Sequence, residues 1–224
     1  MIKLENTEVV GWESAIRGMR NPLESWSKSD SHDAWDMPND GEVLVDPGKY
    51  ADDHMYVLGK NDMDLMMRLR QAGTDHRKFM RMIVVYCDIT APVYWVVELD
   101  TYKVATVRNS CSFMHKGASK TYTVEDFSWH GLDKDDPEYV NFVLSKINYL
   151  KDKYVETKDL NVFQQLRDVV PQGLNVKFTY MCNYETLANI YKSRKDHKLD
   201  EWHTFCDWVR ELPYSELITG DKKE

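Results

Sequence analysis

The sequence lacks the long apolar run that marks a membrane protein. Its 224 residues contain no stretch close to the roughly 18 apolar residues that a membrane-spanning helix needs. The first ten residues, MIKLENTEVV, also lack the apolar core of a signal peptide. We therefore expect a cytoplasmic protein that does not bind membranes.

Closely spaced metal ligands are missing as well. The four cysteines form no CxxC pair, so neither a structural zinc site nor a disulfide framework is predicted. The histidines show no HxxxH spacing, and we expect no metal site. Cys87 and Cys182 lie in apolar, strand-like runs, where a thiol behaves as a small hydrophobic group. Cys111 lies among polar residues and is the cysteine we consider for chemistry.

An excess of positive charge is lacking, because 37 acidic residues outnumber 29 basic ones and the formal net charge is -8. An acidic chain is poorly suited to a nucleic-acid backbone, and we expect no nucleic-acid partner. A small phosphorylated ligand needs only a local cluster of cations. The segment TYKVATVRNSCSFMHK supplies one, since it gathers Lys103, Arg108, His115 and Lys116 among hydroxyl groups.

Hydrophobic residues make up 42% of the chain and aromatic residues 12%, enough for a sizeable core. No internal repeat is visible. We expect a single domain over residues 1–224, with an irregular insertion at about residues 21–60 that is rich in turn-forming residues.

Hydrophobic periodicity predicts an alternation of helices and strands. Asn61 is the expected N-cap of a helix over 61–72, and Asp136-Pro137 begins another. The segment after Pro92 is ambiguous between helix and strand. Asn183 is expected to cap a further helix. The remaining expected elements are strands over 82–89 and 174–182 and helices over about 160–167 and 199–212. This order is typical of an α+β fold.

Two segments resemble a known family. RDVVP (167–171), a strand and then NYETLANIYKSR (183–194) look like the C-terminal signature of flavin-dependent thymidylate synthases, also called thymidylate synthase complementing proteins. GTDHRKFMRMIVVYCDITAP (73–92) looks like the loop and strand that lead into that family's active-site helix. The resemblance spans roughly residues 61–212. It is most specific at Arg167 and in the segment 183–194.

The resemblance implies an α+β fold whose antiparallel sheet packs with helices. It also implies a homotetramer with active sites between subunits. The implied reaction is the reductive methylation of dUMP to dTMP, a methyltransferase step of nucleotide biosynthesis. In that family FAD carries hydride from NADPH, and methylenetetrahydrofolate supplies the carbon.

The same resemblance assigns roles to the signature residues, each beside a plainer alternative. Arg167 and Arg194 match arginines that bind the nucleotide, although either is also typical of a solvated helix end. Asn189 and His197 are similar to residues that contact the flavin. Asn183 has the same match, and an N-cap alone also explains it. His197 stands further from Trp202 than its family counterpart does.

The segment 101–116 departs from the family pattern. Where the family has Gln and then an Arg-His-Arg triplet, this chain has Glu98 and Thr101-Tyr102-Lys103. Arg108 stands at a position where the family has Asn. We expect Glu98 and Arg108 to contact the nucleotide, and Lys103, which keeps the charge of its counterpart, to contact the cofactor.

Cys111 stands where the family has its catalytic-loop Ser. It would be a nucleophile towards C6 of a pyrimidine if Lys103 or Arg108 stabilised its thiolate. Ser110 and Ser112 flank it, and a shift of one residue would restore a Ser at this place. The alternative is a polar-loop cysteine without a catalytic role.

Three hypotheses remain open at the level of sequence. The first is a flavin-dependent enzyme that alkylates C5 of a pyrimidine deoxynucleotide, with hydroxymethylation as a variant. The second is a repurposed nucleotide-binding homologue without redox activity, because a fold can outlast its chemistry. The third is a structural or interaction protein with an acidic N-terminal cover.

Overall fold

The structure is a computed structural model that describes residues 2–33 and 56–221. Its contacts group into two compact units. The first unit contains the described residues of 1–3, 89–101 and 108–179, and the second those of 4–88, 102–107 and 180–224. The expectation of a single domain over the whole chain stays a prediction.

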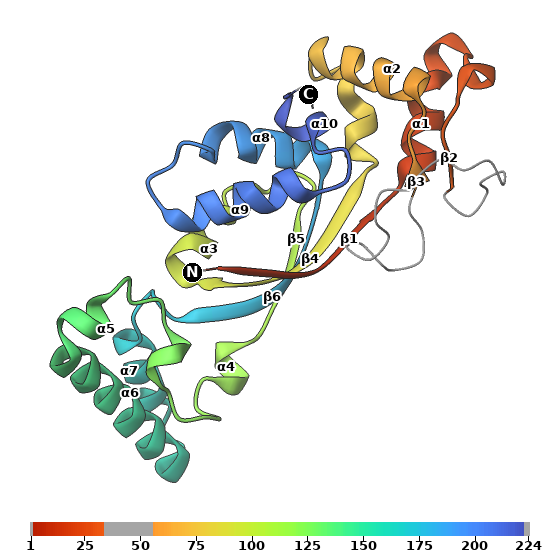
Figure 1. Ribbon diagram of the computed structural model, residues 1–224. Helices are drawn as coiled ribbons and strands as arrows, with labels where there is room; N and C mark the ends of the chain where they lie inside the picture. The colour runs from red at the N-terminus through yellow and green to blue at the C-terminus, as the bar shows by residue number, and fades with distance from the viewer. Residues whose placement is uncertain (1, 34–55, 222–224) are drawn as a thin grey trace. The chain divides into compact units, whose positions relative to one another are not determined.

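The expected α+β fold with an antiparallel sheet is confirmed (Figure 1). The sheet has four strands in the order β1-β4-β6-β5. Their bounds are Lys3–Val10 for β1, Val84–Pro92 for β4, Val107–Ser110 for β5 and Asn175–Asn183 for β6. Strands β4 and β6 are the two that the sequence predicts. Along β6 the side chains of Phe178, Tyr180 and Cys182 are buried while Lys177 and Thr179 are exposed, as the alternating pattern predicts.

The first unit is built mainly from helices. Their bounds are Val93–Leu99 for α3, Phe113–Lys116 for α4, Leu132–Asp135 for α5, Pro137–Thr157 for α6 and Leu160–Val169 for α7. The ambiguous segment after Pro92 is therefore helical. Helices α6 and α7 pack side by side (Figure 1). Val140, Leu144, Ile147 and Leu150 repeat at helical spacing along α6, and all four are buried in the core of this unit.

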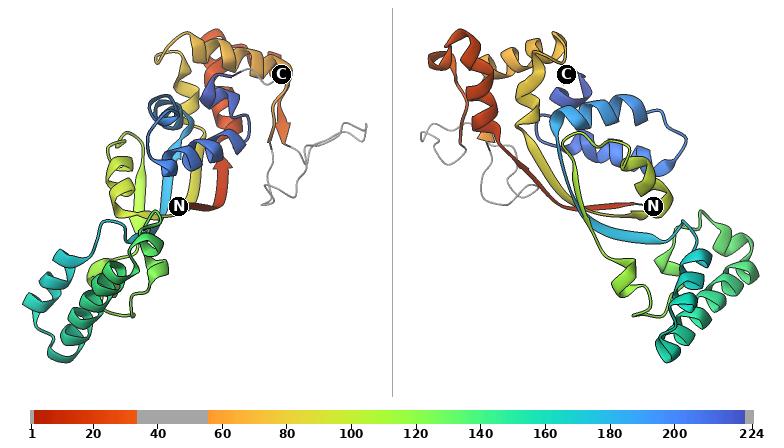
Figure 2. Two further views of the ribbon diagram at one scale, coloured as in Figure 1. Left: turned by 60° about the vertical axis from the view of Figure 1, so that its left-hand side comes forward. Right: turned by 180° about the vertical axis from the view of Figure 1, so that it is seen from behind.

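The described residues of the second unit form five α-helices beside its strands. They are α1 (Trp12–Arg20), α2 (Lys60–Gln71), α8 (Tyr184–Arg194), α9 (Asp200–Glu211) and α10 (Glu216–Thr219). Helix α8 packs against both α9 and α10 (Figure 2). The Trp12 ring meets the Tyr184 ring edge to face at 5.3 Å between centroids, which ties α1 to the start of α8.

The expected insertion at residues 21–60 lies partly outside the described residues. Its described ends form short 3-10 turns at Asn21–Leu23 and Trp26–Lys28. They also form a two-stranded antiparallel pair, β2 (His32–Asp33) with β3 (Tyr56–Val57).

The expected N-cap of helix α2 is wrong. The helix begins at Lys60 with Gly59 at the cap position, so Asn61 lies inside the first turn. The capping acceptor comes instead from Asp30, which is distant in sequence. Its carboxylate accepts hydrogen bonds from the backbone N–H groups of Asn61 at 2.8 Å and Asp62 at 3.1 Å. A carboxylate from a distant segment thus caps the helix N-terminus, the role that the local pattern assigned to Asn61.

A fully buried carboxylate anchors this corner of the second unit. Asp62 accepts from Arg20 Nε at 2.6 Å and from the hydroxyls of Ser29 and Ser31 at 2.7 Å each. The backbone N–H groups of Asp30 and Ser31 add two more donors. Burial opposes the charge, but the hydrogen bonds from the serines and Arg20 outweigh it and lower the pKa of Asp62.

We expect Asp62→Asn to destabilise the protein by about 3–5 kcal/mol, because it leaves the buried Arg20 charge without its partner. Urea unfolding followed by circular dichroism measures the change. Asp64→Asn on the same helix is the matched control, since Asp64 pairs with Lys60 in the solvent, and it should change little. Equal unfolding midpoints for the two variants would contradict this account.

The pH dependence has a defined sign. A carboxylate whose pKa is lower in the folded state stabilises that state above its unfolded pKa, and loses this effect as the pH falls through the folded pKa. The contribution of Asp62 should therefore disappear below about pH 4, and Asp62→Asn should flatten the acid limb of the stability curve in that window.

Across the described ranges 2–33 and 56–221, no helix combines the length and the apolar character needed to cross a membrane.

Candidate functional site

Helix α8 carries most of the retained signature, and burial limits what it can offer a ligand. The Asn183 side chain accepts from the Thr186 N–H at 2.9 Å, which confirms it as the N-cap, and the residue is 4% exposed. Most residues of the helix that follows this cap are also buried. The residues of α8 that are not buried are Asn189, Lys192, Ser193 and Arg194. Two of these four are signature residues.

Arg194 is held in place by aromatic rings. Its Nε donates to the Tyr102 hydroxyl at 2.9 Å. Its Cζ lies 4.7 Å from the centroid of the Trp202 ring and 5.6 Å from that of Tyr102. His197 meets Trp202 edge to face at 6.2 Å. Because guanidinium groups bind favourably over such rings, Arg194 is already oriented before any ligand arrives.

Asn189 belongs to a second polar cluster on α8. Arg77, in the 3-10 turn Arg77–Arg81, donates from Nη2 to Asn189 Oδ1 at 3.3 Å and from Nε to Glu185 Oε1 at 3.1 Å. Arg81 also donates to the Glu185 carboxylate. Burial would raise the pKa of Glu185, but the hydrogen bonds from Arg81 and Arg77 lower it. The cluster therefore holds two guanidinium groups around one ionised carboxylate.

The segment 101–116 places its guanidinium against an acid. Arg108 makes a bidentate pair with Asp100, with Nε to Oδ1 at 3.0 Å and Nη2 to Oδ2 at 2.8 Å. Arg108 also donates to the Ser110 hydroxyl and lies 5.4 Å from the centroid of the Phe178 ring. Any anion that binds Arg108 through this fork must displace Asp100.

Cys111 is exposed, whereas the other three cysteines are buried. Its backbone N–H donates to the Lys177 carbonyl at 2.9 Å, which fixes the main chain directly after β5. Ser112 is the N-cap residue of α4. Ser110, Cys111 and Ser112 thus follow one another at the end of a paired strand, within the first unit.

The remaining predicted residues lie in different surroundings. Arg167 is exposed, and its Nη1 lies 3.6 Å from the sulfur of Met114, a weak acceptor. Glu98 lies on α3, and its carbonyl accepts from Thr101. Lys103 is exposed, in the short segment 102–107.

The structure brings some of the predicted residues together. One short stretch of the first unit contains Arg108, Ser110, Cys111 and Ser112. The same unit also contains Glu98 and Arg167, outside that stretch. The second unit contains the other five, namely Lys103, Asn183, Asn189, Arg194 and His197. Within it, Arg194 and His197 share the Trp202 ring, while Asn189 faces Arg77.

Sequence reasoning missed Tyr102, Arg77, Arg81 and Glu185. Tyr102 occupies the central place of the family triplet, so its partnership with Arg194 could have been considered from the alignment. The contacts of Arg77 and Arg81 with Glu185 join residues more than a hundred positions apart. No local periodicity reports such a pairing.

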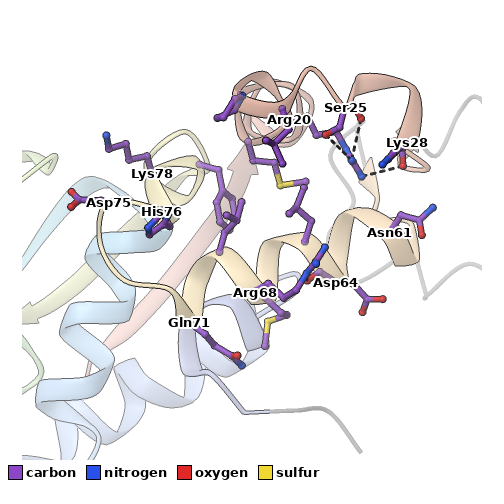
Figure 3. Close-up of a pocket in the computed structure, with 18 residues that line it drawn as sticks. Arg20, Ser25, Lys28, Asn61, Asp64, Arg68, Gln71, Asp75, His76 and Lys78 are labelled. Atoms are coloured by element: carbon purple, nitrogen blue, oxygen red, sulfur yellow. Dashed lines mark hydrogen bonds between the residues drawn. The ribbon is translucent and has the colours of Figure 1, made fainter.

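A cavity of about 1280 Å³ opens on the second unit (Figure 3). Met19, Leu65 and Phe79 contribute apolar surface, and Arg68 and Lys78 contribute positive charge. Arg20 is also in its lining, with its guanidinium directed to the carbonyls of Ser25 and Lys28 (Figure 3). None of the residues predicted from the family resemblance lines this cavity.

Among the residues that the structure describes, no three His, Cys, Asp or Glu side chains are placed to hold a metal ion.

The fold is that of the flavin-dependent thymidylate synthases. A thymidylate synthase X (ThyX) from Helicobacter pylori, solved with FAD and dUMP, superposes with a TM-score of 0.66 over 98% of each chain. A second structure of the flavin-dependent ThyX from that organism, also complexed with FAD and dUMP, gives 0.67 over 99% of this chain and 100% of that one.

A UMP/dUMP methylase, PolB from Streptomyces cacaoi, bound with 5-Br dUMP, superposes with a TM-score of 0.56 over 98% of this chain and 95% of its own. Sequence identity is 14% in all three cases. No protein-family profile matches the chain, and no curated protein matches it in sequence. The likeness therefore establishes the fold, and the chemistry must be argued from the residues.

We expect one fast-reacting thiol in the native protein. Burial raises the pKa of Cys87 to about 12 and that of Cys206 to about 11, and it also raises the pKa of Cys182 well above its ordinary value. Titration with a thiol-specific disulfide reagent should therefore release one equivalent, and Cys111→Ser should abolish it. Two or more fast thiols, or one that survives in Cys111→Ser, would refute this assignment.

We also expect Asp100→Asn to increase the affinity for inorganic phosphate by roughly three- to tenfold, because it frees the Arg108 fork. Isothermal titration calorimetry measures the affinity. Asp135→Asn, at an exposed position of the same unit, is the control for the change in net charge. If both variants bind phosphate like the wild type, Arg108 is not an anion-binding residue.

Proposed function

We propose that this chain is a flavin-dependent enzyme that alkylates C5 of a pyrimidine deoxynucleotide, with dUMP to dTMP as the reaction. The observation that carries the proposal is the near-complete superposition on two ThyX structures and a UMP/dUMP methylase, whose bound molecules are FAD, dUMP and a dUMP analogue. Asn189 is exposed and Arg194 partly exposed, and these two signature residues are among the four residues of the mostly buried helix α8 that a ligand can reach, which supports the proposal.

The residues of the second unit suit a flavin and a nucleotide. Asn189 offers a neutral amide at an exposed position, which fits the polar edge of a flavin ring. Arg194 offers an oriented guanidinium, which fits a uracil carbonyl. His197 and Lys103 are proposed to contact the cofactor as well. Asn183 is committed to capping α8, so its contribution is to place that helix.

The residues of the first unit are proposed to serve the nucleotide. Arg108 and Arg167 would bind anionic or carbonyl oxygens, and Glu98 would accept from the base. Cys111 is proposed as the nucleophile towards C6. Attack by its thiolate places the electron pair at C5, which makes that carbon able to bond to the incoming one-carbon unit. Ser110 or Ser112 would take this place if the loop shifts by one residue.

The overall reaction balances with a carbon donor and a reductant. Methylenetetrahydrofolate would donate a carbon at the oxidation level of formaldehyde, and tetrahydrofolate would leave. Loss of the C5 proton with release of the Cys111 thiolate from C6 would restore the ring double bond, and a hydride would complete the methyl group. A bound flavin supplies that hydride after it is reduced by NADPH. The homotetramer implied by the family is part of the same proposal.

One observation favours a second candidate, a nucleotide-binding homologue without redox chemistry. The Arg-His-Arg triplet of the family is replaced here by Thr101-Tyr102-Lys103, and the nearby Arg108 is already paired with Asp100. Each lost charge-assisted hydrogen bond to a phosphate removes roughly 1.5–3 kcal/mol of binding. In this candidate, Arg194 would still bind the nucleotide while FAD affinity is lost.

The absorption spectrum of the purified protein tests the proposal. We expect a flavin band near about 450 nm, either as purified or after addition of FAD. We also expect rescue of a thymidine-requiring strain by the wild-type chain. Absence of FAD binding together with retained dUMP binding would establish the nucleotide-binding homologue. Absence of FAD binding and of dUMP binding would contradict both candidate functions.

The role of Arg194 is tested by dUMP titration. Arg194→Ala should weaken dUMP binding by roughly 10- to 100-fold, as expected for the loss of a charge-assisted hydrogen bond. Lys192→Ala, which removes an exposed cation from the same helix, is the matched control and should bind dUMP normally. Equal losses in the two variants would indicate a general effect of charge.

A further inference from the structure

Three side chains on the second unit form a short chain of hydrogen bonds from the interior to the surface. Glu185 and Asn189 lie one turn apart on α8 and so share a face of the helix. Arg77 contacts both of them, through Nε to Glu185 at 3.1 Å and through Nη2 to Asn189 at 3.3 Å.

Exposure increases along this chain. The Glu185 side chain is 9% exposed and that of Arg77 19%, whereas Asn189 is an exposed residue. Arg81 donates to the same carboxylate through Nε and Nη2. The inner end is therefore fixed by two guanidinium groups, and Arg77 transmits that fixed geometry outwards to the amide.

The chemistry of Arg77 decides which way the Asn189 amide points. A guanidinium has only donors, so the atom that faces it must be the amide oxygen. The two ends of an Asn side chain are otherwise nearly interchangeable. With its oxygen held by Arg77, the Asn189 NH₂ group is the end left to meet a ligand.

We infer that Glu185 and Arg77 are positioning residues that make Asn189 an obligatory hydrogen-bond donor to the bound molecule. The identity of that molecule rests on the proposed function. For a flavin, the matching atom is an acceptor, a ring carbonyl oxygen or an unprotonated ring nitrogen, and the N3–H group is excluded as the partner of Asn189.

The first test needs no ligand. Protein labelled with ¹⁵N-asparagine gives a side-chain NH₂ signal for Asn189, assigned by its loss in Asn189→Ala. We expect restricted motion of this group in the wild type and increased motion in Arg77→Met. Arg81→Met is the matched control and should have a smaller effect, because the hydrogen bonds of Arg81 go to Glu185 and not to Asn189 within the described part of the chain.

Glu185→Gln should increase the motion of the Asn189 NH₂ group, because it removes the carboxylate charge that holds the Arg77 guanidinium. Arg77→Lys keeps the charge beside Glu185 but loses the fork that reaches both partners, so it provides a folded substitute if Arg77→Met unfolds. Unchanged motion of the Asn189 amide in Arg77→Met or Arg77→Lys would overturn the inference.

The second test is a double-mutant cycle on FAD affinity. Arg77→Met and Asn189→Ala should each weaken FAD binding by about tenfold, and the double variant should bind like Asn189→Ala alone. Asn189→Asp, which presents only acceptors, should bind FAD more weakly than Asn189→Ala. Additive losses, or tighter binding by Asn189→Asp, would overturn the inference. A wild type that binds no FAD would overturn the proposed function, while the amide signal still decides the role of Arg77.

Discussion

Burial of helix α8 is the constraint on which the candidate site depends. The helix is packed against α9, α10 and the turn Arg77–Arg81, and its N-terminus is closed by the Asn183 side chain. Of the four residues of α8 that are not buried, two belong to the family signature, namely Asn189 in the middle of the helix and Arg194 at its end. Because both are held by partners inside the same unit, the site is organised by the fold before any molecule binds.

The two polar clusters on α8, one around Arg194 and one around Glu185, stabilise buried or partly buried charges in different ways. Arg194 keeps its charge while lying over apolar rings, which lowers the cost of taking a cation partly out of water. Glu185 is a nearly buried carboxylate that would be costly without the guanidinium groups of Arg77 and Arg81. The segment 101–116 adds a third arrangement, in which Asp100 neutralises Arg108 until a stronger anion competes for it.

Features set by local pattern could be predicted from the sequence. The helix from Asp136-Pro137, the alternating strand up to Cys182 and the Asn183 cap all depend on neighbours a few residues away, and all are confirmed. The cap at Asn61 was wrong because Asp30, from a separate segment, occupies that role. The contacts of Glu185 could not be predicted, since they join distant residues by charge and not by periodicity.

The paired charges around Glu185 also bear on how such a chain can change over time. Loss of Glu185 would leave the guanidinium groups of Arg77 and Arg81 without their shared carboxylate, whereas loss of either arginine alone would leave the other one beside Glu185. Of the three positions, 185 is therefore the least free to change, because two cations depend on its one carboxylate.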